Sequence, residues 1–278
     1  MIRLIAIDLD GTLFGEDLVI SPANRAAIAA AQARGVAVTL ATGRMFRSAR
    51  PYARDLGITT PLICYQGALI RDPVTEATLF HRPLAQPLAR EVIALVQAQG
   101  LHPNVYLDDT LYADALNPGT EFYSRLNGGL PIHPVGDLTA FLRRRGGDPT
   151  KLSVVLADEP ATDALVAELH AHFGDRLYAT KSYPIFAEAL NATVDKGRAL
   201  RTLAAHLGIA PEETLAIGDG SNDLPLLQAA GIGVAMGQAH ATVRAAAHHV
   251  TSPLAEDGVA AAITRFVLAP DAPDTPAP

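Results

Sequence analysis

The stretch "LIAIDLDGTLF", Leu4 to Phe14, ends an apolar run on two aspartates followed by a glycine. Residues 3–9 are short, apolar and bounded by turn-forming residues, which predicts a buried strand. Asp8 and Asp10 are two residues apart, so in an extended chain they point to the same side, roughly 6–7 Å from each other. Such a pair can flank one small group, which makes this stretch a candidate site.

The bulk composition is that of an ordinary globular protein. The chain has 278 residues, 49% hydrophobic and 18% charged, and this length favours one large or two moderate domains. The net charge of −7 argues against nucleic acid as a partner, because phosphate backbones select basic surfaces. The sequence predicts no membrane span and no signal peptide, so we expect no membrane partner and a cytoplasmic location. The single cysteine, Cys64, excludes an intramolecular disulfide and is expected in the core.

Apolar strands alternate with helices near both ends of the chain. Ser21 is a candidate N-cap for one of these helices, and Gly35 and Gly208 are candidates for helix ends. The alternation predicts an α/β fold, a Rossmann-like doubly wound parallel sheet with helices on both faces. The expected strands are 3–9, 36–43, 61–65, 214–220 and 231–237, and the expected helices are 21–35, 46–56, 196–208, 241–247 and 258–268.

The middle of the chain has a different pattern, which predicts an inserted α+β cap domain. We expect irregular structure from the end of its second strand to about residue 147. The predicted domains are a core of 1–83 plus 191–268, a cap of 84–190, and a disordered tail of 269–278 that is rich in Pro and Asp. The expected cap elements are helices 87–99 and 161–173 and strands 103–107, 110–114, 151–157, 176–180 and 184–189.

Polar side chains stand at the carboxyl ends of three predicted core strands. Ligands bind at these ends in open parallel sheets, so we expect the three groups to share one crevice. The groups are Asp8 with Asp10, then Thr42, then Asp219 with Asn222 and Asp223.

The acidic members of this set predict a bound cation. Two unit charges roughly 4 Å apart repel by about 1 kcal/mol in water and about 4 kcal/mol at an intermediate dielectric. The cluster is therefore expected to need a cation, and oxygen-only ligands favour Mg²⁺ over zinc. The carboxylates are those of Asp8, Asp10, Asp219 and Asp223.

Four motifs occur in a fixed order: "DLDGTL" at 8–13, "TGR" at 42–44, "DKGRAL" at 195–200 and "GDGSND" at 218–223. In these motifs the chain resembles the haloacid dehalogenase superfamily. Its large insertion between the second and third motifs resembles the α/β cap (type IIB) of the Cof-type phosphatases. The resemblance covers nearly the whole chain. One departure is Gln66-Gly67, where Cof-type relatives usually have Asn-Gly.

The resemblance implies a role for each motif. Asp8 would be the nucleophile, and Asp10 would be the general acid and then the general base. Thr42 would hydrogen-bond the phosphoryl group, and Lys196 would offset its charge. The implied metal ligands are Asp8, the Asp10 backbone carbonyl, Asp219 and Asp223. The implied substrate contacts are Thr42, Gly43, Arg44, Lys196 and Asn222.

Simpler interpretations exist for each motif taken alone. "DLDGTL" can be a strand with an ordinary Asp-Gly turn, Thr42 a plain strand-end residue and Lys196 a solvated lysine at a helix start. Arg44 and Arg47 fit a solvated surface better than a substrate contact, although either side chain can reach an anion.

The sequence as a whole predicts a Mg²⁺-dependent phosphatase that acts on small monoesters, such as sugar phosphates or phosphorylated cofactors. The alternatives are a phosphotransferase or phosphomutase on the same scaffold, and a non-catalytic ligand sensor. The expected partner is a small phosphorylated metabolite, and the oligomeric state stays open. Cap residues that can face the crevice are Tyr106, Tyr112, Lys181 and Tyr183.

Overall fold

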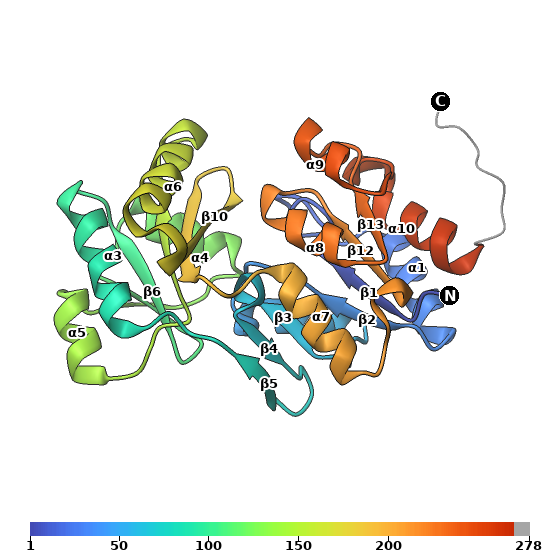
Figure 1. The fold of residues 1–278 in the computed structure, drawn as a ribbon, viewed down its shortest axis with the longest axis horizontal. Helices are drawn as coiled ribbons and strands as arrows, with labels where there is room; N and C mark the ends of the chain where they lie inside the picture. Colours follow the sequence, from blue (N-terminus) through green and yellow to red (C-terminus); the bar gives the residue numbers. More distant parts are fainter. Residues whose placement is uncertain (270–278) are drawn as a thin grey trace.

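The centre of the molecule is a parallel sheet in the order β14-β13-β12-β1-β2 (Figure 1). The computed structural model describes residues 1–269. All four residues of β1 are fully buried, which fits its central position in the sheet. The strands are β1 (Leu4–Ile7), β2 (Ala37–Leu40), β12 (Thr214–Gly218), β13 (Ile232–Ala235) and β14 (His249–Val250).

The register of this sheet brings the predicted polar groups to one edge. Ile7, the last residue of β1, lies opposite Leu40 in β2 and Ile217 in β12, and all three strands run in the same direction. The residues that follow these strands therefore emerge at the same edge. This placement confirms the predicted parallel sheet.

Helices cover both faces of the sheet, as predicted for a doubly wound fold. Ile5 and Ile7 of β1 belong to the apolar cluster that contains residues of α1 and α10. Leu4 and Ala6 point to the opposite face and pack with residues of α7 and α8. The helices of this part are α1 (Pro22–Ala33), α2 (Phe46–Asp55), α7 (Lys196–His206), α8 (Leu224–Ala229), α9 (Ala241–Ala246) and α10 (Gly258–Ile263), which continues as a π-helical turn to Leu268.

The start and end of α1 follow the local sequence signals. The Ser21 side chain accepts a hydrogen bond from the backbone N–H of Asn24 at 3.1 Å, and Pro22 occupies the first helical position. Gly35, just after the helix, has φ +79°, a conformation that glycine adopts at little cost.

The predicted third strand does not extend the parallel sheet. β3 (Leu62–Cys64) touches the core through a bridge between Ala41 and Ile63, and it pairs antiparallel with β4 (Leu69–Arg71), itself paired with β5 (Thr78–His81). The strand itself was predicted and its bridge to the core is parallel, but the antiparallel pairing with the strands that follow was not predicted. The chain turns back directly after β3, through residues 65–67, whose φ angles are all positive.

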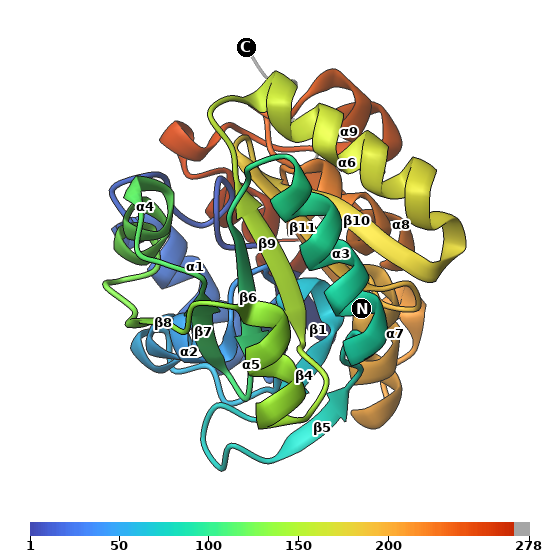
Figure 2. The same cartoon turned by 90° about the vertical axis from the view of Figure 1, so that its left-hand side faces the viewer.

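The cap is a mixed sheet in the order β10-β11-β9-β6-β7-β8. Helices α3, α5 and α6 cover its outer face, which faces the viewer in Figure 2. Tyr106 and Phe186 point to the other face and pack in the same cluster as core residues. The elements are α3 (Gln86–Ala98), β6 (Pro103–Leu107), β7 (Thr110–Ala113), α4 (Pro118–Leu126), β8 (Ile132–Pro134), α5 (Leu138–Arg145), β9 (Lys151–Val155), α6 (Glu159–Phe173), β10 (Leu177–Tyr183) and β11 (Phe186–Asn191).

Residues 115–147 are more regular than the sequence predicted. Two helices and a strand replace the expected irregular structure, because capping residues overcome the Gly and Pro content. Asn117 caps α4 through a reciprocal pair of bonds with Thr120, and Asp137 caps α5 through the backbone N–H of Ala140.

We propose that the cap begins at about residue 84 and ends at about residue 190, where the chain crosses between the two sheets. The predicted tail of 269–278 lies outside the described residues, apart from Ala269. Within residues 1–269, no helix combines the length and the apolar character needed to cross a bilayer.

Gly197→Ala tests the packing between α7 and α8. Alanine is normally favoured over glycine in a helix by about 1 kcal/mol. A Cβ at this position would lie 2.1 Å from the Pro225 carbonyl oxygen, so we expect a loss of about 1–3 kcal/mol of stability. Thermal unfolding measures it, with the exposed Ala205→Gly in the same helix as control. A higher melting temperature for Gly197→Ala would contradict this packing.

Candidate active site

Three carboxylates meet where β1 and β12 end. Asp8 follows β1, and its backbone N–H donates to the Ile217 carbonyl at 3.0 Å. Asp8, Asp219 and Asp223 each offer a carboxylate oxygen, and these three oxygens lie within 4.8 Å of one another. The side chain of Asp10 is not a member of this group.

The Lys196 ammonium lies between two of these carboxylates. Its Nζ donates to Asp8 Oδ1 and to Asp223 Oδ1, each at 2.6 Å, and its side chain is fully buried. Lys196 is the first residue of α7, so the helix start on one face of the sheet delivers the charge to the strand ends. Burial alone would lower the pKa of Lys196, but the charges of Asp223 and Asp8 raise it, which keeps the ammonium protonated.

The remaining negative charge is not balanced by this one cation. Burial, followed by the charge of Asp223, raises the pKa of Asp8 well above its usual range. The same two causes raise the pKa of Asp219 to about 7, although the Thr12 hydroxyl donates to Asp219 Oδ1 at 2.5 Å and opposes the shift. A buried set of hard oxygen donors with unbalanced charge fits a divalent cation such as Mg²⁺.

Glycine and backbone bonds hold this cluster together. Gly11 has φ +84°, and a Cβ there would lie 2.4 Å from Asp219 Oδ2, so a larger residue would collide with the carboxylate. Asp223 Oδ2 accepts hydrogen bonds from the backbone N–H groups of Asp219, at 3.0 Å, and Gly220, at 2.9 Å. These bonds orient Asp223 while its other oxygen accepts from Lys196.

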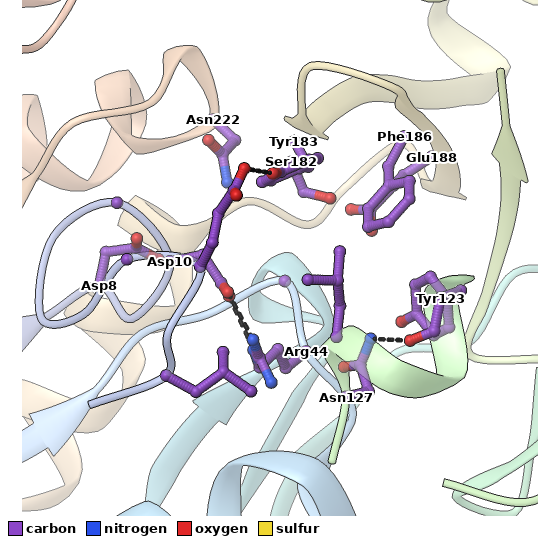
Figure 3. Close-up of a pocket in the computed structure, with 16 residues that line it drawn as sticks. Asp8, Asp10, Arg44, Tyr123, Asn127, Ser182, Tyr183, Phe186, Glu188 and Asn222 are labelled. Carbon is purple, nitrogen blue, oxygen red and sulfur yellow. Dashed lines mark hydrogen bonds and ion pairs between the residues drawn. The ribbon is translucent and has the colours of Figure 1, made fainter. Parts of the chain in front are cut away.

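Asp10 points away from the cluster and pairs with Arg44 (Figure 3). Arg44 donates through Nε at 2.8 Å and Nη2 at 2.6 Å to the two carboxylate oxygens. Its guanidinium also stacks on Phe14 and Tyr52 and is 6% exposed. The interpretation of Arg44 as a solvated surface residue was therefore wrong. Burial alone would lower the pKa of Arg44, but the bond to Asp10 raises it.

The other predicted residues surround this pair. Thr42 is fully buried, and its hydroxyl oxygen accepts from the Arg44 backbone N–H at 3.1 Å. Gly43 lines the cleft beside Arg44, and Asn222 Nδ2 donates to Gln66 Oε1 at 3.2 Å. Arg47 is exposed, as predicted.

A family model described as haloacid dehalogenase-like hydrolase matches residues 5–263. The chain belongs to this family. A phosphatase from Bacillus subtilis, 5-amino-6-(5-phospho-D-ribitylamino)uracil phosphatase YitU, is 30% identical over 92% of this chain and 94% of its own. The putative phosphatase YxeH from the same organism is 30% identical over 97% of this chain and all of its own.

Solved structures agree with the fold of this hydrolase. A haloacid dehalogenase-like hydrolase from Bacteroides thetaiotaomicron has a TM-score of 0.83 and 29% identity, and the match covers 96% of this chain and all of that one. The TM0651 structure from Thermotoga maritima has a TM-score of 0.80 and 30% identity, with 95% of this chain and 97% of that chain covered.

A cleft between core and cap opens onto the hydrolase's acidic cluster. It contains two adjoining cavities of about 180 Å³ and 450 Å³, and both are lined by Asp10, Asn222 and Tyr183. Tyr123 and Phe186 of the cap form an apolar wall of the smaller cavity (Figure 3). A substrate in this cavity would lie between the strand-end carboxylates and the cap.

Two of the four cap candidates face this cleft. Lys181 lines the larger cavity and pairs with Glu159 and Asp163 at 2.6 Å each. Tyr183 lines both cavities, and its hydroxyl donates to Glu16 at 2.8 Å. The other two candidates are not among the residues that line these cavities. Tyr106 is fully buried beside Tyr65 of the core, and Tyr112 packs against Phe141 inside the cap.

Two buried charges of the cap were not found from the sequence. Lys151 and Glu188 form an ion pair with side chains 1% exposed. The available signal was a charged residue inside or next to an apolar strand, in "KLSVV" and "FAEAL", because such a residue needs a buried partner.

Metal removal should make stability depend on pH. The raised pKa of Asp219, about 7, means that the folded state holds a proton that the unfolded state releases near pH 4. In the metal-free protein, the contribution of Asp219 to the free energy of unfolding is therefore largest below pH 4. This contribution falls as the pH rises from about 4 to about 7. We expect Mg²⁺ to raise the melting temperature more at pH 8 than at pH 5. Thermal scans with chelator and with Mg²⁺ at each pH measure the rise in melting temperature that Mg²⁺ causes. Asp219→Asn should bring the rise at pH 8 closer to the rise at pH 5. Equal Mg²⁺ effects at both pH values would contradict a metal site here.

Proposed function

We propose that this hydrolase is a Mg²⁺-dependent phosphatase that cleaves small phosphate monoesters through an aspartyl-phosphate on Asp8. The observation that carries the proposal is the cluster of Asp8, Asp219 and Asp223, two of them paired with Lys196, at a sheet edge that opens into the cap cleft. The matched relatives are named as phosphatases, and the enzyme class is phosphoric monoester hydrolase.

The reaction uses two carboxylates in different surroundings. An oxygen of Asp8 attacks phosphorus while the bond to the ester oxygen breaks. Asp10, which carries a proton at this step, gives that proton to the ester oxygen. Water then attacks the phosphoryl group, Asp10 takes the water's proton, and the Asp8 carboxylate is released. Lys196, bonded to Asp8, offsets negative charge throughout.

The metal site would be formed by Asp8, Asp219 and Asp223, together with the Asp10 carbonyl. A bound Mg²⁺ would offset the charge of the phosphoryl group and of these carboxylates. Thr42, Gly43 and Asn222 are proposed to contact the phosphoryl group or the rest of the substrate, and Arg44 to orient Asp10.

The proposed substrates are sugar phosphates or phosphorylated cofactors and their precursors. Relatives named as phosphatases of a phosphoribitylamino uracil support a small polyhydroxylated substrate. Small-molecule sites measure roughly 300–1,000 Å³, and the two adjoining cavities beside Asp10, of about 180 Å³ and 450 Å³, offer such a molecule room only when taken together. A cytoplasmic location remains a prediction.

Asp8→Asn should lower phosphate release from 4-nitrophenyl phosphate by about 10³-fold or more, because an amide is a poor nucleophile. Steady-state assays with Mg²⁺ measure it, and thermal unfolding serves as the control for folding. Retained turnover in a folded variant would remove Asp8 from the reaction.

Product analysis with an added sugar separates hydrolysis from transfer, because transferase activity would give a new sugar phosphate in place of free phosphate.

Asp10→Asn should distinguish good from poor leaving groups. An alkyl oxygen needs a proton to leave, whereas nitrophenolate does not. General acid catalysis typically contributes about 10²-fold or more. We therefore expect the alkyl ester to lose about 10-fold more activity than the nitrophenyl ester. The ratio of kcat/KM for the two esters is the measurement. The same loss for both esters would assign Asp10 a role other than proton donor.

A further inference from the structure

The ion pair between Lys151 and Glu188 has no part in the proposed reaction. Lys151 begins β9 and Glu188 lies in the neighbouring strand β11, both in the cap, and each side chain is 1% exposed. Removing two charges from water costs several kcal/mol for each ion, and a buried pair contributes little net stability. Stability is therefore a poor explanation for this pair, and its other contacts show what it can do.

The pair reaches from the cap into the core. Lys151 Nζ donates to the Gly43 carbonyl at 2.8 Å and to Glu188 Oε1. Glu188 Oε2 accepts from Gln66 Nε2 at 2.8 Å. Gly43 and Gln66 both belong to the core, so two cap charges are bonded to two core segments.

Gln66 extends this network to the strand end after β12. Its Oε1 accepts from Asn222 Nδ2 at 3.2 Å, and its side chain lies against Gly43, where a Cβ would be 2.5 Å from Nε2. Tyr65 and Gln66 have φ angles of 51° and 54°, a conformation that is strained for residues other than glycine. Tertiary contacts must sustain this conformation, and the network with Glu188 is one of them.

The backbone of residues 42–44 receives three hydrogen bonds in succession. Two donors are core backbone N–H groups, and the middle donor is the cap ammonium. The bonds are Gln66 N to Thr42 O at 3.1 Å, Lys151 Nζ to Gly43 O at 2.8 Å, and Tyr65 N to Arg44 O at 3.0 Å.

The middle bond sets the orientation of one peptide group. Because the peptide unit is planar, fixing the Gly43 carbonyl also fixes the Arg44 N–H, which donates to the Thr42 hydroxyl oxygen at 3.1 Å. A hydroxyl oxygen that accepts this bond keeps its own proton for another acceptor. A contact made by the cap thus controls the Thr42 hydroxyl in the core.

We propose that Lys151, Glu188 and Gln66 are positioning residues that make placement of the Thr42–Arg44 segment depend on docking of the cap. This inference rests on the proposed function, in which Thr42 contacts the phosphoryl group. Lys151 fixes the Gly43–Arg44 peptide, Glu188 holds Lys151 in place, and Gln66 ties Glu188 to Asn222. The Gly43–Arg44 peptide takes the observed orientation when the cap is docked on the core, because only then does Lys151 reach the Gly43 carbonyl.

The test separates positioning from stability by replacing the whole pair. Lys151→Met alone leaves Glu188 buried without its cation and should lower the melting temperature. The double variant Lys151→Met/Glu188→Met keeps similar side-chain volumes and removes both charges, so its melting temperature should recover above that of Lys151→Met. It should stay below the wild-type value, because the Gly43 carbonyl and the Gln66 amide lose their partners. The kcat of the double variant for 4-nitrophenyl phosphate with Mg²⁺ should stay about 10- to 100-fold low, because small displacements of reacting groups cost this much. KM should change by less than about 3-fold, since the loss lies in the transition state.

If the double variant recovers its melting temperature and has the wild-type kcat, the inference is overturned. The Lys151–Glu188 pair would then have a role in folding or stability and none in positioning residues 42–44. A fall in kcat/KM that lies wholly in KM would also overturn it. If the wild type itself released no phosphate, the proposed function would fail first, so the two failures are distinguishable.

Two further variants keep the test decisive if the double variant does not fold. Gln66→Met removes the bonds to Glu188 and Asn222 at similar volume, and it should lower kcat in the same way with KM nearly unchanged. Unchanged kcat would contradict the network. The matched control is Arg176→Met/Glu91→Met, which removes an exposed cap ion pair with side chains 58% and 48% exposed and should leave kcat at the wild-type value.

Discussion

Buried negative charge at one edge of the core sheet is the constraint on which the rest of the site depends. Asp8, Asp219 and Asp223 lie close together, the first and last buried and Asp219 half-buried, and the Lys196 ammonium pairs with Asp8 and Asp223. Such a cluster is unstable by itself, because each carboxylate loses hydration and repels its neighbours. The fold supports it with a parallel register that brings the strand ends together and with backbone N–H groups that bond Asp223. A divalent ion would complete the balance of charge.

The ion pair between Arg44 and Asp10 places a second carboxylate of this edge in different surroundings from Asp8. Asp8 is buried and bonded to Lys196, whereas Asp10 is 31% exposed in the cleft and held by both nitrogens of Arg44. One carboxylate is thus shielded and charge-compensated, whereas the other is accessible from the cleft, which fits the proposed roles of nucleophile for Asp8 and proton donor for Asp10. The cap then determines what reaches them, through the aromatic wall of the cleft and through the Lys151–Glu188 contact with the core.

Much of the fold was predictable because it depends on local signals. Ser21 and Gly35 mark the ends of α1, and the apolar runs mark the buried strands of the core. The predictions failed where a tertiary or capping interaction overrode composition. Tyr65 and Gln66 adopt positive φ angles without being glycine, and this turn lets the predicted strand β3, which bridges the core in parallel, also begin an antiparallel sheet that was not predicted. Asn117 and Asp137 start helices in a stretch whose Gly and Pro content suggested irregular structure.

The sequence by itself determined the parallel core, the order of the four motifs and three of the four carboxylates that it placed in one cluster, because strand-end position and residue chemistry are local properties. The fourth, Asp10, turns to Arg44 instead. The sequence did not determine the partners of those side chains. Arg44 is buried against Asp10. Lys151 lies 108 residues from Gly43 in the sequence and bonds its carbonyl, because one face of the cap sheet packs against the core. Contacts between a cap strand and a core loop depend on where the inserted domain comes to rest, and that placement belongs to the tertiary structure alone.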